Sequence, residues 1–236
     1  MKRKYQAGTG LLCAALAGYG LVPSEYLKYR WRQRGRKRSR DSRMGKRLYL
    51  TFDDGPDRVY TGQLLDLLKL HRIQAGFFVV GEFARENPEL IRRMKSEGHF
   101  IGIHSVSHEN ALFRGREFIR KDLEDSVEIL RNLGCEVSAY RPPWGHLNLW
   151  TLYYCQRMKL KLTFWDVMAH DWAARETAGS IEKKILQRVF PGAVVCLHDG
   201  RGKDHAPGRT VEALRNALPV LLKRGYSFEK MDVYQW

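Results

Sequence analysis

Short apolar runs alternate with longer segments of helical periodicity along most of this chain. Six runs have the length of a strand and few polar interruptions, and a shorter one follows near the end; they lie at about 47–52, 75–80, 99–103, 137–141, 160–165, 193–197 and 226–231. Between them, apolar residues recur at helical spacing, which predicts helices at about 64–70, 82–97, 117–133, 148–158, 180–189 and 209–224. This alternation predicts an α/β fold in which helices cover a parallel sheet.

Charge separates the first 47 residues from the rest. Of the net charge of +15, residues 1–47 carry +12, from 14 Lys and Arg against 2 Asp and Glu, which leaves +3 for residues 48–236. The folded part is therefore close to balance and shows no basic recognition helix, so nucleic-acid binding by this part is not expected. We expect residues 1–45 to form a basic N-terminal segment and residues 46–236 to form one domain. Nucleic-acid binding through residues 28–47 remains an alternative.

The N-terminal segment contains an uncharged apolar stretch of 16 residues, Ala7–Val22. This is shorter than the roughly 20 residues of a transmembrane helix, and Ala15-Leu16-Ala17 fits a signal-peptide cleavage site. A membrane anchor, a cleaved signal peptide and a buried or interfacial helix all remain open. The basic run Lys28–Arg43 that follows could contact anionic lipid or an anionic wall polymer, or be a solvated linker.

Two segments carry residues suited to metal chemistry. Thr51-Phe52-Asp53-Asp54-Gly55-Pro56 sets two adjacent carboxylates at the end of an apolar strand, where successive residues face opposite sides. His104-Ser105-Val106-Ser107-His108 spaces two imidazoles by four residues, so one helical turn would place both on one face. Each segment alone also fits a turn or a loop. Together they supply two nitrogen ligands, one oxygen ligand and a spare carboxylate, as in a catalytic metal site with an open position.

Three further polar segments follow or end apolar runs. They are Arg141-Pro142-Pro143-Trp144-Gly145, Asp171-Trp172 and Leu197-His198-Asp199. In parallel α/β barrels, active sites are built at the carboxyl ends of the strands. The recurrence of such residues at these positions therefore predicts one active site at that edge.

These five segments, in this order, resemble the sequence motifs of the polysaccharide deacetylases, the NodB-homology group of the family-four carbohydrate esterases. The resemblance covers roughly Lys46 to Trp236 and does not extend to residues 1–45. It implies a distorted, incomplete (β/α) barrel, and the count of about seven parallel strands agrees with that.

The resemblance implies a set of metal ligands and a general base. Asp54, His104 and His108 would hold a divalent metal, and Asp53 would be the general base for the attacking water. Arg141 would pair with Asp53 and keep it charged and aimed, as second-shell partners do.

The resemblance also implies an acid and a substrate pocket. His198 would protonate the departing amine, and Asp171 would orient and charge it, since a neighbouring carboxylate raises the pKa of an imidazole. The backbone N–H of Trp144 would help bind the oxyanion. Leu197 would line the pocket for the acetyl methyl group, and Trp172 could stack on a sugar.

The chain departs from the family pattern at two positions. Met168 stands where many relatives have an additional Asp, three residues before Asp171, so the wall of the substrate groove is expected to differ. Trp144 stands where Tyr is common, which changes a stacking surface and leaves the backbone N–H in place. His170, next to Asp171, is interpreted as a bystander, and residues 201–204 as a loop near the site.

The sequence predicts a metal-dependent hydrolase that removes N-acetyl groups from amino-sugar polymers such as peptidoglycan or chitin-like chains. An O-acetyl xylan esterase and a deacylase of a lipid-linked sugar remain alternatives, because esters and amides pass through the same tetrahedral intermediate. An inactive carbohydrate-binding or membrane-tethered protein is the non-enzymatic alternative. Two His and one carboxylate favour Zn²⁺, with Co²⁺, Ni²⁺ or Mn²⁺ also suited. We expect an extracytoplasmic monomer, membrane-anchored or secreted.

Overall fold

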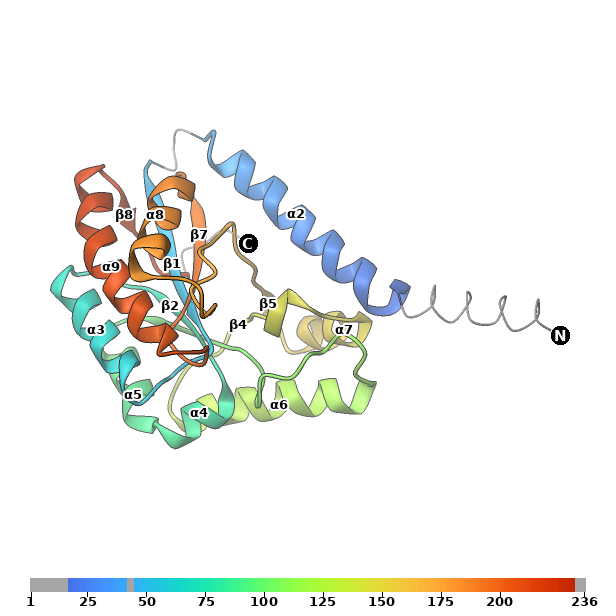
Figure 1. Ribbon diagram of the computed structural model, residues 1–236. Helices are drawn as coiled ribbons and strands as arrows, with labels where there is room; N and C mark the ends of the chain where they lie inside the picture. Colours follow the sequence, from blue (N-terminus) through green and yellow to red (C-terminus); the bar gives the residue numbers. More distant parts are fainter. Residues whose placement is uncertain (1–16, 42–44, 232–236) are drawn as a thin grey trace.

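The computed structural model describes residues 17–41 and 45–231 (Figure 1). Most of the apolar stretch Ala7–Val22 and the last five residues of the predicted domain lie outside these ranges. Within the described ranges, no helix has both the length and the apolar character needed to cross a bilayer.

All described strands belong to one sheet, and every strand pair in it is parallel. The order is β5-β4-β3-β2-β1-β7-β6, with β8 paired to the beginning of β1. No pairing within the described residues joins the two outer strands, β5 and β6, so the curled sheet stays open. This confirms the prediction of an α/β, incomplete barrel of about seven parallel strands; the two-residue β6 was not predicted. The strands are β1 (Arg47–Asp53), β2 (Gly76–Val79), β3 (Phe100–Ile103), β4 (Ala139–Tyr140), β5 (Lys161–Leu162), β6 (Val167–Met168), β7 (Ala193–His198) and β8 (Ser227–Phe228).

The predicted helices are present, with one correction. The single helix expected at 82–97 is two helices, because Asn87 leaves the helical conformation (φ −130°, ψ 58°) before Pro88, and proline disfavours helix at the preceding residue. A π-helical turn, Ala17–Leu21, leads into the first long helix, and a 3₁₀ turn spans Pro143–Gly145. The α-helices are α2 (Val22–Arg38), α3 (Tyr60–Leu70), α4 (Gly81–Glu86), α5 (Pro88–Ser96), α6 (Arg116–Asn132), α7 (Leu149–Arg157), α8 (Ala178–Arg188) and α9 (Ala206–Lys223).

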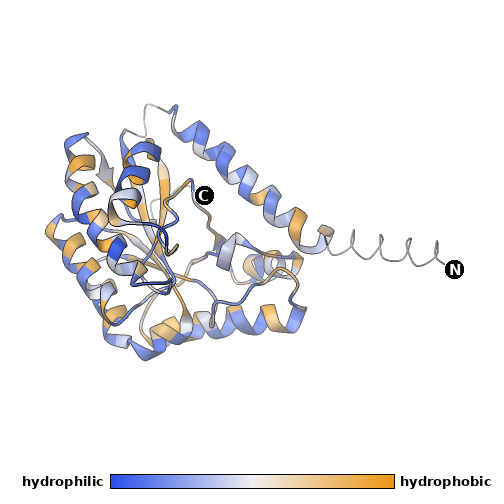
Figure 2. Cartoon of the chain, viewed as in Figure 1, coloured by the Kyte–Doolittle hydropathy of each residue, from blue (hydrophilic) through white to orange (hydrophobic). Residues whose placement is uncertain are grey.

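The two faces of the sheet bury different clusters. On β1, alternate residues from Leu48 to Phe52 belong to the larger cluster, which the helices cover, whereas Tyr49 belongs to a smaller cluster with Phe78. The strands are largely hydrophobic, as Figure 2 shows. Because side chains alternate along a strand, Asp53 lies on the Tyr49 side, inside the curl. The inner face of the sheet therefore ends in a carboxylate.

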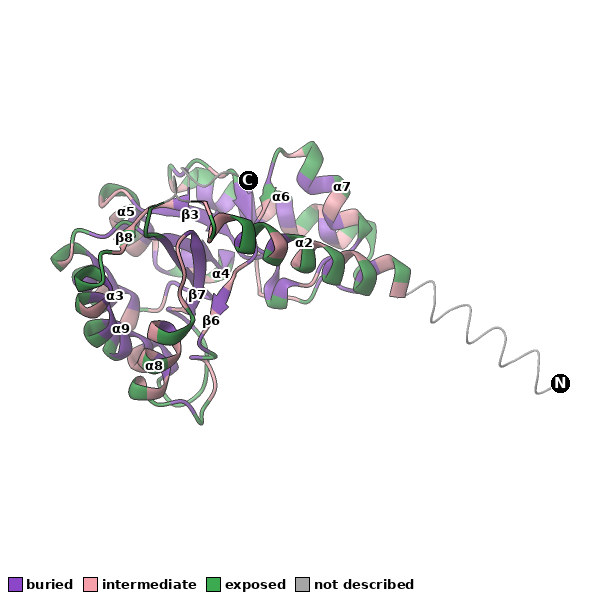
Figure 3. Cartoon of the chain, turned by 90° about the horizontal axis from the view of Figure 1, so that it is seen from above, coloured by how far each residue is buried: buried purple, intermediate pink, exposed green. Residues whose placement is uncertain are grey.

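Helix α2 packs against the open side of the barrel although it precedes the predicted domain. Trp31 is 5% exposed within the smaller cluster and meets the ring of Phe164, between β5 and β6, at 5.9 Å between ring centroids. Nearer the end of the helix, Arg38 pairs with the buried Asp166 at 2.8 Å. The opposite face of α2 is exposed (Figure 3). The basic run predicted from Lys28 is thus helical as far as Arg38 and is docked on the domain by one face.

Candidate active site

One cavity at the carboxyl edge of the sheet collects most of the predicted site residues. The register pairs Asp53 of β1 with His198 of β7, and His104 directly follows β3. The cavity has a volume of about 420 Å³. Seven of the ten predicted site residues line it, and the other three, Arg141, Asp171 and Leu197, are buried. The lining residues are Asp53, Asp54, His104, His108, Trp144, Trp165, Met168, His170, Trp172, His198, Arg201 and Gly202.

Asp54, His104 and His108 converge on one point. The Nε2 atoms of His104 and His108 lie 3.2 and 3.0 Å from Oδ1 of Asp54, and the ligand atoms of all three lie within 4.8 Å of one another. All three side chains are largely buried: those of Asp54, His104 and His108 are 12%, 3% and 8% exposed. This is the compact, mixed nitrogen and oxygen donor set of a metal site.

The expected helical turn between the two histidines is wrong. Residues 104–110 form an irregular loop, in which Ser105 and His108 have left-handed backbone conformations (φ 72° and 57°). Such conformations are uncommon for residues other than glycine and need support from the surrounding structure. Asp122 of α6 supplies it: its Oδ1 accepts hydrogen bonds from the Ser105 hydroxyl (2.9 Å) and the Val106 N–H (2.8 Å). Sequence reasoning missed Asp122, because an acid on the polar face of a helix carries no distinctive signal.

The hydrogen bonding of His104 leaves its other ring nitrogen available to bind a cation. Its Nδ1 lies 2.6 Å from the carbonyl oxygen of Arg141, which can only accept, so Nδ1 carries the proton. In the neutral ring, Nε2 then presents a lone pair to Asp54 Oδ1, an oxygen that has no hydrogen-bond donor among the described residues. A lone pair that faces a carboxylate oxygen calls for a positive charge between them.

Asp53, which directly precedes Asp54, is held in place by Arg141. Arg141, fully buried, donates from Nη1 to Asp53 Oδ1 (2.6 Å) and to the hydroxyl of Thr51 (2.9 Å). Its guanidinium also lies 4.0 Å from the centre of the Phe78 ring. The other oxygen of Asp53 accepts from the thiol of Cys196 at 3.2 Å. The carboxylate is thus fixed in direction by donors on both of its oxygens.

Asp53, Cys196 and His198 also form a compact group, with potential ligand atoms within 4.8 Å. This group suits a cation less well. The Cys196 thiol is buried and its pKa is raised well above the usual value by burial and by the Asp53 charge, whereas a thiol binds metal as the thiolate. Arg141 already balances the charge of Asp53. Of the two groups, the Asp54 group is the better suited to a metal ion.

His198 and Asp171 form a second Asp–His arrangement across the cavity. Nδ1 of His198 lies 2.9 Å from Oδ1 of Asp171, which is fully buried. Asp171 Oδ2 accepts from the His198 N–H and from Thr210, each at 2.8 Å. Burial alone would lower the pKa of His198, but the charge and hydrogen bond of Asp171, with smaller contributions from Asp54 and Asp53, raise it to about 9. The ring therefore holds a proton at neutral pH.

The predicted substrate residues have mixed positions. Trp144 is 52% exposed with a left-handed backbone (φ 54°, ψ 9°), and its ring lies 4.4 Å from that of His108. The Trp172 ring lies 4.9 Å from that of His198. Leu197, in contrast, is fully buried in the larger apolar cluster and is not among the described residues that line the cavity.

Other cavity residues were not assigned to the site from the sequence. His170, interpreted as a bystander, lines the cavity and contacts Trp172 at 5.1 Å between ring centroids. Trp165, Met168 and Arg201 line it as well. Three tryptophans therefore line the cavity, two of them in ring contact with its histidines.

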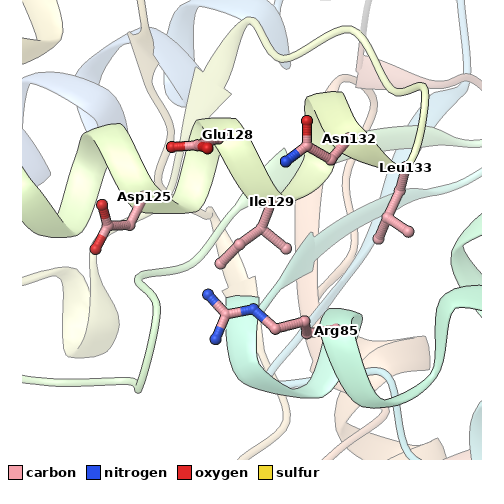
Figure 4. Close-up of a pocket in the computed structure, with 6 residues that line it drawn as sticks. All are labelled: Arg85, Asp125, Glu128, Ile129, Asn132 and Leu133. Atoms are coloured by element: carbon pink, nitrogen blue, oxygen red, sulfur yellow. The ribbon is translucent and has the colours of Figure 1, made fainter.

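A second cavity of about 450 Å³ lies between α4 and α6 (Figure 4). Figure 4 shows Arg85 below Asp125 and Glu128, with the aliphatic side chains of Ile129 and Leu133 beside them. None of its lining residues is a histidine or a cysteine, and none follows the carboxyl end of a strand. It is a surface groove between two helices and has no part in the site described above.

Comparison with known proteins agrees with this geometry. The profile of the polysaccharide deacetylase family matches residues 40–163. The peptidoglycan-N-acetylmuramic acid deacetylase PdaA of Bacillus subtilis is 36% identical over 192 residues, which cover 79% of this chain and 70% of that protein.

Two solved structures are similar in fold as well as in sequence. A peptidoglycan N-acetylglucosamine deacetylase in complex with 4-naphthalen-1-yl-N-oxidanyl-benzamide superposes with a TM-score of 0.74 at 33% identity, covering 79% of this chain and 86% of that one. A family 4 acetyl xylan esterase from Clostridium thermocellum, in complex with a cobalt ion, gives a TM-score of 0.73 at 32% identity, covering 79% and 89%. The chain belongs to the polysaccharide deacetylase family.

Proposed function

We propose that this protein is a metal-dependent N-deacetylase of amino-sugar polymers, with peptidoglycan as the first candidate substrate. One observation carries the proposal: a metal-ligand group, an Arg-held carboxylate and a proton-carrying histidine face a single cavity of about 420 Å³. An amide bond needs all three, because the water must be activated, the oxyanion stabilised and the amine protonated before it leaves.

The proposed metal ligands are Asp54, His104 and His108. Two imidazoles and one carboxylate suit Zn²⁺, and Co²⁺, Ni²⁺ and Mn²⁺ also accept this donor set. A bound divalent cation would lower the pKa of water towards about 7 and polarise the acetyl carbonyl. His104 is oriented for this role by its Nδ1–H, which the Arg141 carbonyl accepts.

Asp53 and His198 divide the proton transfers. Asp53 lies beside the metal-ligand group with its direction set by Arg141, so it can accept a proton from the attacking water. A nitrogen of His198 lies within 4.8 Å of an Asp53 oxygen, across the space where the substrate carbon would sit. His198 carries a proton and can donate it to the amine nitrogen, and Asp171 stabilises the positive charge of the ring before that transfer.

The cavity wall favours a sugar substrate. Trp144, Trp165 and Trp172 present aromatic surface to the cavity, and aromatic rings commonly pack against the apolar faces of pyranose rings. The relatives named above act on peptidoglycan, whereas the esterase on xylan is similar only as one structural neighbour. We therefore place N-deacetylation first and O-deacetylation of xylan second.

The test is acetate release by the full chain, loaded with Zn²⁺, from N-acetylglucosamine oligomers, purified peptidoglycan and acetylated xylan. We expect acetate from the amino-sugar substrates, and its loss on treatment with EDTA. The matched control is Asp53→Asn, which should retain metal and lose turnover by about 10²–10⁴-fold, the usual contribution of a general base. Acetate from xylan alone would replace the proposal by the esterase. An active Asp53→Asn enzyme would remove Asp53 from its role.

We further propose an extracytoplasmic location, with the N-terminal segment as anchor or signal. The support is the uncharged stretch Ala7–Val22 and the peptidoglycan substrates of the relatives. Fractionation of cells that express the full chain tests it: the protein should be accessible to protease added outside the cytoplasmic membrane. Protection from that protease in intact spheroplasts would contradict it.

A further inference from the structure

Exposed apolar side chains gather around the beginning of α2. Eleven large apolar side chains are exposed among the described residues, and eight of them lie on α2 and its preceding turn, in the loop 111–115, in the Trp144 turn or on α7. Six of these form what we call the apolar collar: Leu21, Val22, Tyr26, Phe113, Leu149 and Tyr153. Scattered apolar residues are normal on a protein surface, but a concentration at one end marks an interaction site.

Hydrogen bonds tie the three segments of the collar together. The Tyr19 hydroxyl donates to the Arg114 carbonyl (2.5 Å), next to Phe113. The Ser24 hydroxyl donates to the Leu147 carbonyl (2.9 Å) and accepts from the Leu147 N–H (3.0 Å), two residues before Leu149.

The third connection joins the loop to α7. The side-chain amide of Asn148, which caps α7, donates to the carbonyls of Ala111 (2.5 Å) and Arg114 (2.9 Å). Leu149 and Tyr153 are four residues apart on α7, so they share one face of that helix. The collar is therefore a fixed surface built from segments far apart in sequence.

The collar lies at the same edge of the barrel as the cavity. The beginning of α2 contacts the chain that follows the Trp144 turn, whereas its end lies at the opposite edge, where Arg38 donates to the carbonyl of Gly192, just before β7. In between, the Lys28 side chain packs at Gly145, where an added Cβ would be 3.3 Å from its Cδ. The described part of the chain thus begins, at the π-helical turn before α2, near the loop at Arg114 and the chain that follows the Trp144 turn (Figure 1).

Basic residues surround the collar. Arg30 and Arg32 lie on α2, and Arg114, Arg116 and Arg157 lie beside Phe113 and on α6 and α7; all five are exposed. Two exposed acids, Glu25 and Glu117, and the partly exposed Glu109 lie among them, and Glu25 and Glu109 are paired with Lys28 and Arg114. Aromatic and aliphatic side chains ringed by arginines match the chemistry of a bilayer interface with anionic headgroups.

We propose that the apolar collar docks on the surface of an anionic phospholipid bilayer, with the cavity opening beside that surface. The chain itself supports this partner over others, because the uncharged stretch Ala7–Val22 runs directly into the collar at Leu21 and Val22. An anionic wall polymer would pair with the arginines but would leave the aliphatic side chains of Leu21, Val22 and Leu149 exposed to water. The N-terminal stretch and the collar would each contact the membrane. Two contacts fix the orientation of the domain on the bilayer, whereas one contact leaves the domain free to turn.

The consequence concerns the substrate. A cavity held against the bilayer reaches acetylated sugars close to the membrane, such as newly made or lipid-linked chains, before those deep in a wall. The docking itself does not depend on the deacetylase proposal, and its test measures binding without turnover.

The experiment places an environment-sensitive fluorophore on single cysteines in the full chain. Phe113→Cys and Leu149→Cys report on the collar, and Leu70→Cys and Leu222→Cys are matched controls, exposed leucines on α3 and α9. All four are made with Cys13→Ser; the other three cysteines are buried. The probe is a vesicle of phosphatidylcholine with phosphatidylglycerol, and a pure phosphatidylcholine vesicle is the comparison.

We expect labels at 113 and 149 to shift to shorter emission wavelengths and to be quenched by nitroxide lipids, more strongly with phosphatidylglycerol. Labels at 70 and 222 should stay in water. Equal responses from all four labels, or vesicle binding that leaves 113 and 149 in water, would overturn the proposal. A shift at 113 and 149 that grows with protein concentration in the absence of vesicles would assign the collar to a second copy of the chain instead.

Discussion

Two Asp–His groups face the same cavity and are used in opposite ways. In the Asp54 group, Nε2 of His104 faces the carboxylate at 3.2 Å while its Nδ1–H is engaged by the Arg141 carbonyl. In the other, Nδ1 of His198 faces Asp171 at 2.9 Å, so one proton lies between them. The same two residue types thus form a group suited to a cation in one case and hold a proton in the other. What differs is the second partner of each ring, which fixes the tautomer.

The largest expected effect is His104→Ala, which removes a ligand. Two remaining donors, Asp54 and His108, bind a divalent ion much more weakly than three. We expect bound Zn²⁺, measured by atomic emission after dialysis, to fall below one per chain and acetate release to become undetectable. Full metal occupancy in this variant would show that the ion binds elsewhere, for example at the Asp53, Cys196 and His198 group.

His198→Ala tests the proton donor and leaves the metal-ligand group unchanged. The metal-ligand atoms are untouched, so we expect full metal occupancy together with a loss of kcat of about 10²–10⁴-fold, the range for a lost general acid. The measurement is acetate release alongside metal analysis of the same sample. Substrates with a better leaving group than an amine should lose less, since they need less protonation. An equal loss on an aryl acetate ester would argue against the acid role.

Asp171→Asn tests what holds the proton on His198. Asp171 raises the pKa of His198 to about 9, so the protonated ring prevails below that pH and is lost as pH rises through it. The rate should therefore fall as pH rises above the pKa of His198. A bound cation is positive and would lower that pKa, so this alkaline limb of the pH–rate profile would lie at a lower pH. In Asp171→Asn the limb should move further towards neutrality, with kcat reduced at least about tenfold at alkaline pH. A pH–rate profile of kcat with an unmoved alkaline limb would contradict the assignment.

The chemistry of both groups could be predicted from the sequence, but their supports could not. Asp53, Asp54 and His198 stand at the ends of apolar strands, so strand pattern and residue type together place them at one edge. The four-residue spacing of His104 and His108 led to the right pair through the wrong local structure, a helix, whereas a loop with two left-handed residues brings them together. Backbone conformations of that kind depend on contacts from elsewhere in the fold.

The docking of α2 was beyond prediction for a related reason. The helix has seven Lys or Arg in 17 residues, which favours a solvated segment. Its apolar contact with the domain rests on Trp31 and the partly buried Leu27, and Trp31 inserts into a cluster whose other buried members come from across the barrel. Local pattern shows what a segment prefers in water; it does not show which gap in a distant sheet that segment fills.

The smallest expected effect comes from Asp122→Ala, which removes no ligand. Asp122 holds the loop between His104 and His108 through the Ser105 hydroxyl and the Val106 N–H. Without it, the left-handed residues lose their support and the two imidazoles are less well placed. We expect a fall in metal affinity of about 10–100-fold, typical for an outer partner of a metal site. At saturating metal, kcat should recover most of its value, since the ligands themselves remain.

The matched control is Asp125→Ala on the same helix, a partly exposed acid whose ion pair is with Lys121 and not with the loop. Competition with a chromophoric chelator measures metal affinity in both variants. Weaker binding in Asp122→Ala alone would show that the loop is held in place by Asp122. Equal affinities would mean that the loop keeps its shape without Asp122, and that the Arg141 carbonyl, which holds His104, is the outer partner that matters for the Asp54 group.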